Sequence, residues 1–183
     1  MIPINLIPAE SDQLKSDYLS VNPQGLVPTL SENGHLLTQS LAIIEYLEEL
    51  CPTPALLPKT PLARAQVRSL ALLIASDIHP LNNLRVLSQL KQQFQASVEQ
   101  TNEWYHHWLK KGFDAMEKQL KQLPRTIPVC YGHDVTLADL CLIPQVYNAK
   151  RFHFSLKHYP LIEEINEYCL TQSAFSDAAP TPI

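Results

Sequence analysis

Four prolines stand within residues 51–61 of this 183-residue chain. Proline has a fixed φ and no backbone N–H, so neither a helix interior nor a central strand tolerates this density. We therefore interpret residues 53–60 as a linker that separates a domain of residues 1–52 from a domain of residues 61–183. Thr60-Pro61 suits the start of a helix, with the threonine as its cap and the proline in its first position.

The first domain mixes strand and helix patterns. Apolar residues alternate over residues 2–6, as in a short strand. The pair Asn33-Gly34 between two apolar runs is typical of a β-hairpin turn, and the apolar spacing over residues 41–50 predicts a helix. We expect a mixed α/β domain.

The second domain has the apolar spacing of helices almost throughout. Pro80 should end or kink its first long helix. Thr136 and Asp139 resemble the two ends of a capping box that opens another helix, and residues 178–183 should form a loose tail. Predicted helical segments cover residues 67–74, 109–120 and 159–170.

Composition narrows the possible function classes. The 14 Lys and Arg residues form no cluster, and against 18 Asp and Glu they leave a net charge of −4, which argues against a nucleic-acid-binding surface. No apolar run approaches the roughly 18 residues of a membrane span, and the first residues lack the features of a signal peptide. The four glycines form no phosphate-binding motif. We expect a cytoplasmic protein that binds neither nucleic acid nor membrane.

The residue types that bind metals are scattered. His106 and His107 are neighbours on a helix and point in different directions, and no Cys or His spacing suits zinc. The cysteines form no Cys-x-x-Cys pair and are interpreted as reduced, buried thiols. They are Cys51, Cys130, Cys141 and Cys169. We expect no metal.

Val27-Pro28 precedes the first strand of the predicted hairpin. The residues alone favour an ordinary trans proline at a sheet edge. The alternative is a cis bond, in which the N–H and C=O of Val27 would be free to pair with a peptide-like ligand.

Gln39-Ser40 stands where the next helix should begin. The simplest interpretation is helix capping. The alternative is an anion site, in which the free N–H groups, the helix dipole and the serine hydroxyl hold a carboxylate.

Polar residues gather around the proline in residues 77–85, among them His79, Asn83 and Arg85. An exposed polar face explains them most simply, and a site at a helix kink is the alternative. Arg151, further on, is interpreted from the residues alone as a solvated helix end.

Together these segments resemble the cytosolic glutathione transferases, most closely their zeta class, the maleylacetoacetate isomerases. The stretches that carry the resemblance are Asn22–Leu30, Thr38–Glu49, Asp77–Leu87, Val135–Val146 and Asn148–Phe152. The resemblance implies a glutathione transferase fold, with a thioredoxin-like domain before an all-helical domain. It also implies a homodimer and glutathione as cofactor.

The resemblance also implies roles for individual residues. Val27 would precede a cis-proline, Pro28, and pair its backbone with the cysteinyl part of glutathione. Gln39 and Ser40 would hold the γ-glutamyl carboxylate, and Arg151 a carboxylate of the substrate. Further glutathione contacts are implied at Gln13, His79, Asn83, Leu84 and Arg85. At position 79 relatives can have Gln instead of His, and both side chains can donate a hydrogen bond.

The implied reaction is glutathione-dependent cis–trans isomerisation of maleylacetoacetate, a dicarboxylate, to fumarylacetoacetate in tyrosine catabolism. The thiolate of the cofactor would act as the nucleophile. A second interpretation is glutathione transfer to, or dehalogenation of, small α-halo acids. A third is a non-catalytic scaffold with the transferase fold.

The family also begins with a strand and helix that carry a Ser-Ser-Cys motif, and the sequence contains no such motif. Its first residues match the second strand of the family, so we expect an incomplete thioredoxin-like domain without the first βα unit, and the catalytic residues stay unassigned. Three explanations stay open: a different natural start, completion by a partner, or a degraded paralogue.

Overall fold

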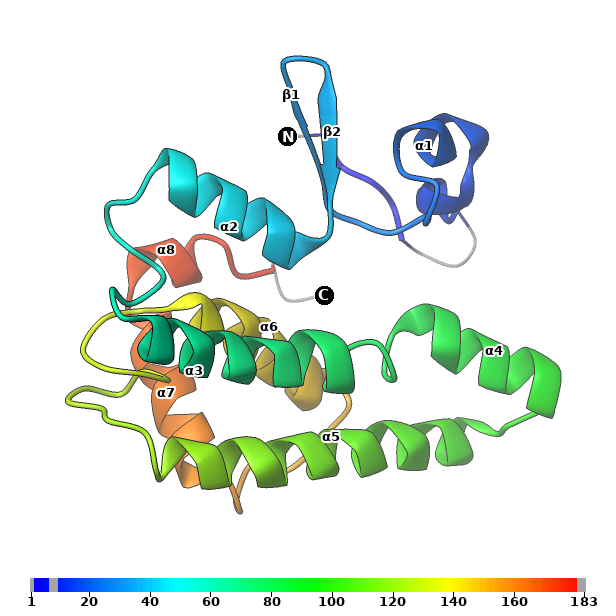
Figure 1. The fold of residues 1–183 in the computed structure, drawn as a ribbon. Helices are drawn as coiled ribbons and strands as arrows, with labels where there is room; N and C mark the ends of the chain where they lie inside the picture. The colour runs from blue at the N-terminus through cyan, green and yellow to red at the C-terminus, as the bar shows by residue number, and fades with distance from the viewer. Residues whose placement is uncertain (1, 7–9, 181–183) are drawn as a thin grey trace. The chain divides into compact units, whose positions relative to one another are not determined.

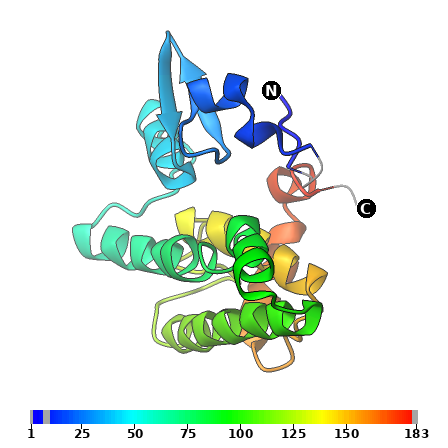
Figure 2. The same ribbon diagram turned by 90° about the vertical axis from the view of Figure 1, so that its right-hand side faces the viewer.

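The computed structural model describes residues 2–6 and 10–180. The chain divides into two compact units, Met1–Pro54 and Ala55–Ile183, and the ribbon of each is drawn in Figures 1 and 2. The first unit combines a two-stranded sheet with helices, and the second is built from helices.

The first unit is organised around a β-hairpin. Its elements are the 3-10 helix η1 (Asp12–Leu14), α1 (Ser16–Val21), β1 (Thr29–Glu32), β2 (His35–Thr38) and α2 (Ser40–Leu50). The strands are antiparallel, with Thr29 opposite Thr38. Asn33 and Gly34 have φ of 49° and 82°, as a two-residue hairpin turn requires. The hairpin prediction is confirmed, and Figure 1 shows β2 leading directly into α2.

The strand predicted over residues 2–6 is wrong, since these residues form no strand. The backbone N–H of Asn5 donates to Oδ2 of Asp12 at 3.1 Å, and its C=O accepts from the N–H of Asp12 at 2.8 Å. These backbone groups therefore bond to the start of η1, whereas a strand needs a neighbouring strand as its partner.

The second unit is formed by helices of different lengths. They are α3 (Pro61–Leu72), the π-helix η2 (Leu73–Ile78), α4 (Leu84–Phe94), α5 (Val98–Leu120), α6 (Leu137–Arg151), α7 (Pro160–Leu170) and α8 (Ser173–Ser176). α3 packs against α6, and α5 packs against η2 and α7. Figures 1 and 2 show α4 and α5 side by side as an antiparallel pair. Within the described ranges, no helix is long and apolar enough to cross a membrane.

Apolar periodicity places the core of the second unit correctly. The side chains of Val67 and Leu70 on α3 and of Leu109 and Phe113 on α5 are fully buried, as the helical spacing predicts. Pro80 does follow the end of the first long helix, but the helix first changes from α to π at Leu73.

Local caps fix the ends of two helices. The Thr60 side chain accepts from the N–H of Ala63 at 3.4 Å, before Pro61 as the first residue of α3. At the start of α6, the N–H and hydroxyl of Thr136 donate to Oδ2 of Asp139 at 2.8 and 2.9 Å. Both capping predictions are confirmed.

Two further sequence predictions have different outcomes. All four thiols are free, and Cys130 and Cys169 are buried as predicted. Cys141 is only half-buried, and Cys51 is exposed because it lies just beyond the end of α2. Of the predicted loose tail, Ala178–Pro180 lies outside any helix or strand, and residues 181–183 lie outside the described residues.

Candidate functional site

A hydrogen-bonded turn places Val27 at the start of the hairpin. The carbonyl of Leu26 accepts from the hydroxyl of Tyr18 and from the side-chain amide of Asn22, both at 2.7 Å. The Tyr18 hydroxyl also lies 3.0 Å from Oγ1 of Thr29. The backbone is therefore held on both sides of Val27 and Pro28.

The Val27–Pro28 peptide bond is cis, so the trans bond favoured by the residues alone is wrong and the cis bond implied by the resemblance is present. Val27 is 42% exposed. Within the described residues its N–H and C=O have no backbone partner. Both groups are thus available to a ligand that extends the chain like a strand.

The amino end of α2 is open. Ile43 N–H makes the first intrahelical bond, to the carbonyl of Gln39 at 3.0 Å, so the N–H groups of Ser40 and the next two residues precede the helical ladder. The capping interpretation is wrong for Gln39, because its side chain donates to Oε1 of Gln24 at 2.8 Å and does not cap α2. Gln39 has φ 70° and ψ 113°, a conformation that non-glycine residues rarely adopt and that clusters at ligand sites.

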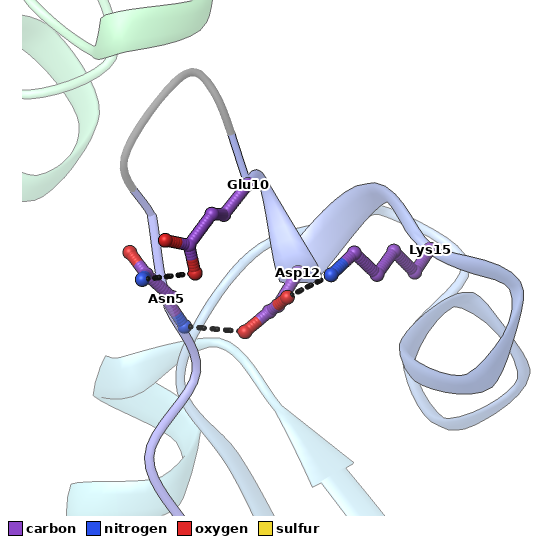
Figure 3. A network of polar contacts seen from close by, with 4 residues as sticks. All are labelled: Asn5, Glu10, Asp12 and Lys15. Atoms are coloured by element: carbon purple, nitrogen blue, oxygen red, sulfur yellow. Dashed lines mark hydrogen bonds and ion pairs between the residues drawn. The ribbon is translucent and has the colours of Figure 1, made fainter.

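Gln13 lies in η1, and its side-chain Oε1 is buried without a hydrogen-bond partner in the described part of the chain. The surrounding residues hold η1 in place (Figure 3). Asp12 accepts from the N–H of Asn5 and pairs with Nζ of Lys15 at 2.5 Å, and Asn5 Nδ2 donates to Glu10 at 2.6 Å. The Lys15 hydrogen bond is the main cause that lowers the pKa of Asp12.

In the second unit, η2 and the start of α4 bring His79, Asn83 and Arg85 together. Asn83 caps α4, since its Oδ1 accepts from the N–H of Arg85 at 3.1 Å. This bond orients the amide so that Nδ2 of Asn83 points to Nε2 of His79, 3.5 Å away. Desolvation first, and the charge of Arg85 second, lower the pKa of His79. The neutral imidazole therefore accepts at Nε2 and carries its proton on Nδ1. Leu84, between them, is 53% exposed.

Arg151 is the last residue of α6 and is exposed. Its Nη1 lies 3.4 Å from Oδ1 of Asn148, and its guanidinium carbon lies 5.9 Å from the ring centre of Tyr147. In the described ranges no carboxylate forms an ion pair with it. The charge is thus available for an anionic ligand.

Three of the four thiols are poor nucleophiles at neutral pH. Burial raises the pKa of Cys141 to about 11 and that of Cys169 to about 12, and it raises the pKa of Cys130 strongly. A thiol with such a pKa is almost entirely protonated at pH 7. The structure, over the residues it describes, contains no group of His, Cys, Asp and Glu arranged to hold a metal ion.

Three supporting residues were not predicted from the sequence: Tyr18, Asn22 and Gln24. Gln24 accepts a hydrogen bond from the Gln39 side chain, and Tyr18 and Asn22 donate to the Leu26 carbonyl beside Val27. Asn82, which belongs to the polar residues around Pro80, is buried and donates to the carbonyl of Tyr105 at 3.1 Å. Asn22 and Gln24 lie inside the stretch that carries the resemblance. No signal in the sequence marks the other contacts, because their partners are distant along the chain.

Comparisons with known proteins agree with this organisation. The family described as "Glutathione S-transferase, N-terminal domain" matches residues 1–55. A probable maleylacetoacetate isomerase of Vibrio cholerae is 43% identical, and the match covers 92% of this chain and 78% of that protein.

Two solved structures are also similar. A glutathione S-transferase from Legionella pneumophila is 63% identical with a TM-score of 0.83, over 84% of this chain and 80% of that one. A bacterial maleylpyruvate isomerase, a zeta-class glutathione S-transferase, is 43% identical with a TM-score of 0.93. That match covers 97% of this chain and 82% of the isomerase. The chain belongs to the glutathione S-transferase family, and within it to the zeta class of the maleylacetoacetate and maleylpyruvate isomerases.

Proposed function

We propose that this chain is a glutathione-dependent isomerase that converts maleylacetoacetate to fumarylacetoacetate. The observation that supports this most strongly is the open amino end of α2, where the unusual backbone of Gln39 leaves the N–H groups at Ser40 without a cap. The choice of this reaction follows the name of a similar protein, the probable maleylacetoacetate isomerase of Vibrio cholerae, which is 43% identical over 92% of this chain.

The residues of the first unit fit glutathione. Its γ-glutamyl carboxylate suits the amino end of α2, where the helix dipole, the N–H groups and the Ser40 hydroxyl favour an anion. Its cysteinyl backbone suits the free N–H and C=O of Val27, and the unpartnered Oε1 of Gln13 can accept one of its N–H groups. Crystal structures of related maleylacetoacetate isomerases contain glutathione, one of them together with malonate.

In the second unit we assign further glutathione contacts to His79, Asn83, Leu84 and Arg85. The lowered pKa of His79 keeps its imidazole neutral at pH 7, with Nδ1–H free to donate to a carbonyl or carboxylate. Arg85 adds a positive charge beside it. A neutral donor next to a cation suits an anionic tripeptide.

Bound glutathione supplies a thiolate whose reversible addition to the conjugated double bond allows that bond to rotate from cis to trans. The role of the protein is to hold glutathione and the substrate in the relative orientation that this addition requires. Arg151 is assigned to a carboxylate of the dicarboxylate substrate, because its charge has no acidic partner among the described residues. The resemblance further supports a homodimer that works in the cytoplasm and binds neither nucleic acid nor membrane.

A calorimetric titration of glutathione into the protein tests the cofactor assignment. Binding in the micromolar to millimolar range is expected, and the dipeptide cysteinylglycine, which lacks the γ-glutamyl carboxylate, should bind more weakly. Equal affinity for the two would contradict the assignment at Ser40. No binding by the folded protein would favour the scaffold interpretation.

The amount of glutathione consumed per turnover distinguishes isomerisation from conjugation to α-halo acids. An isomerase returns glutathione unchanged, whereas conjugation to an α-halo acid consumes one glutathione for each product formed. Turnover of the maleyl substrate with a constant thiol concentration is the expected result.

A further inference from the structure

The first half of α5 contacts the segment that carries His79 and Arg85. Nε1 of Trp104 donates to the carbonyl of Leu81 at 2.9 Å. Nδ2 of Asn82 donates to the backbone carbonyl of Tyr105 at 3.1 Å. Both bonds end on the loop between His79 and Asn83, so this part of α5 holds the loop in place.

The same part of α5 also contacts the end of α6. The ring of Tyr105 is stacked on the ring of Phe152, with the ring centres 3.8 Å apart and the planes 9° from parallel. Nε2 of His106 lies 2.7 Å from the carbonyl oxygen of Phe152 and donates to it. Phe152 is the residue after Arg151 and has left the helical conformation, with φ −92° and ψ 16°.

These contacts restrain a helix end that would otherwise be loosely held. The last carbonyls of a helix have no intrahelical partner, and the last turn of a helix frays readily. His106 satisfies one such carbonyl, and the Tyr105 ring covers the side chain next to it. The contacts that Arg151 itself makes with Asn148 and Tyr147 both lie within α6. The direction of its guanidinium therefore depends on how firmly this end of α6 is held.

The positive charge of Arg151 also acts on the pKa of the Tyr105 hydroxyl. Its side chain is only 2% exposed, and burial raises the pKa of its hydroxyl. A hydrogen bond with the Gln145 side chain and the positive charge of Arg151 act in the opposite direction.

We propose that Tyr105, together with His106, is a positioning residue for substrate binding, because the Tyr105–Phe152 stack and the His106–Phe152 bond hold Arg151 where it meets a substrate carboxylate. This inference rests on the proposed function of Arg151. Small displacements of a binding group are costly, since productive binding of the substrate requires the two charges to be aligned.

The first test removes the ring of Tyr105 and keeps its backbone. Tyr105→Leu should raise KM for the maleyl substrate about three- to tenfold, as expected for coupling between residues in contact. The affinity for glutathione should change less than about twofold, because the backbone carbonyl that accepts from Asn82 is retained. Tyr105→Phe keeps the ring and should stay close to the parent enzyme. Trp108→Leu is the matched control, because it removes from the same helix an aromatic ring that contacts Trp104 and His107.

A double-mutant cycle then separates positioning from general damage. If Tyr105 acts through Arg151, Tyr105→Leu should have no further effect on KM once Arg151→Ala is present. An unchanged KM in the single Tyr105→Leu variant, or an equal rise in both backgrounds, would overturn the inference. An unchanged KM in Arg151→Ala alone would instead overturn the proposed role of Arg151, so the two failures are distinguishable.

His106 provides a second route if Tyr105→Leu does not fold, which circular dichroism would reveal. His106→Ala removes the donor to the Phe152 carbonyl and should raise KM for the maleyl substrate. His106→Gln retains an N–H donor and should recover most of the loss. Equal KM values in the two variants would contradict the positioning role.

Discussion

Gly112 of α5 lies directly against Ile78, the last residue of η2. A Cβ atom on Gly112 would lie 2.2 Å from both Cγ1 and Cδ1 of Ile78, well inside van der Waals contact. Ile78 is almost fully buried and precedes His79 in the chain. The absence of a side chain at Gly112 is therefore what allows α5 to approach the π-helix that leads into the His79 segment.

Substitution of Gly112 by Ala should destabilise the protein. Overpacking costs about 1–3 kcal/mol, against a gain of about 1 kcal/mol in helix propensity, so we expect a net loss in the free energy of unfolding. Urea denaturation measures it. Lys111→Ala, at the exposed neighbouring position, is the control and should change little. A Gly112→Ala protein as stable as the parent would show that Ile78 can move aside without cost.

Substitution of Ser40 by Ala should weaken glutathione binding. The loss of a hydrogen bond to a charged carboxylate costs about 1–3 kcal/mol, which calorimetry would report as a higher Kd. Ser31→Ala, on an exposed position of β1, controls for the loss of a serine hydroxyl. If the two variants bind glutathione equally well, Ser40 does not hold the carboxylate.

Substitution of Arg151 by Ala should raise KM for the dicarboxylate about ten- to a hundredfold, the effect of losing a charge-assisted hydrogen bond. The affinity for glutathione should stay nearly constant. Lys150→Ala removes the same charge from the adjacent exposed position and tests whether net charge alone is responsible. Equal effects of both substitutions would contradict a specific role for Arg151.

The pKa of His79 should lie below its ordinary value and should rise when Arg85 is replaced by Ala. Desolvation and the Arg85 charge both disfavour the imidazolium. The folded protein then binds this proton less tightly than the unfolded chain. The contribution of His79 to stability is therefore present above the ordinary histidine pKa of 6.5, and is lost as the pH falls below it. An NMR titration of the imidazole measures the pKa of His79, and Lys91→Ala serves as the control for the loss of a positive charge elsewhere on α4. A pKa of His79 that does not rise in the Arg85→Ala variant would contradict the prediction.

Local signals predicted local structure well. Asn33-Gly34 suffices for the hairpin because only such residues accept positive φ at both turn positions. Thr60-Pro61 and the pair Thr136 and Asp139 predict helix starts because a cap is formed by residues three positions apart. In each case the partners are neighbours in sequence.

Contacts between distant residues could not be predicted in the same way. The alternation over residues 2–6 suits a strand, but pairing of Asn5 with Asp12 depends on tertiary context. Ile78 at the end of the π-helix Leu73–Ile78 lies against Gly112, and a lone glycine in a helix does not reveal its neighbour. The stack of Tyr105 on Phe152 joins residues 47 positions apart, and no periodicity marks it.

The most direct measurement of the central claim is turnover of maleylacetoacetate by the purified protein, with glutathione at a concentration far below that of the substrate. The loss of the cis isomer and the appearance of the trans isomer are followed by proton NMR, and free thiol is measured in parallel. We expect complete conversion with the thiol concentration unchanged, and no conversion when glutathione is omitted. Conversion that stops when the glutathione is consumed, or an equal rate without it, would contradict a glutathione-dependent isomerase.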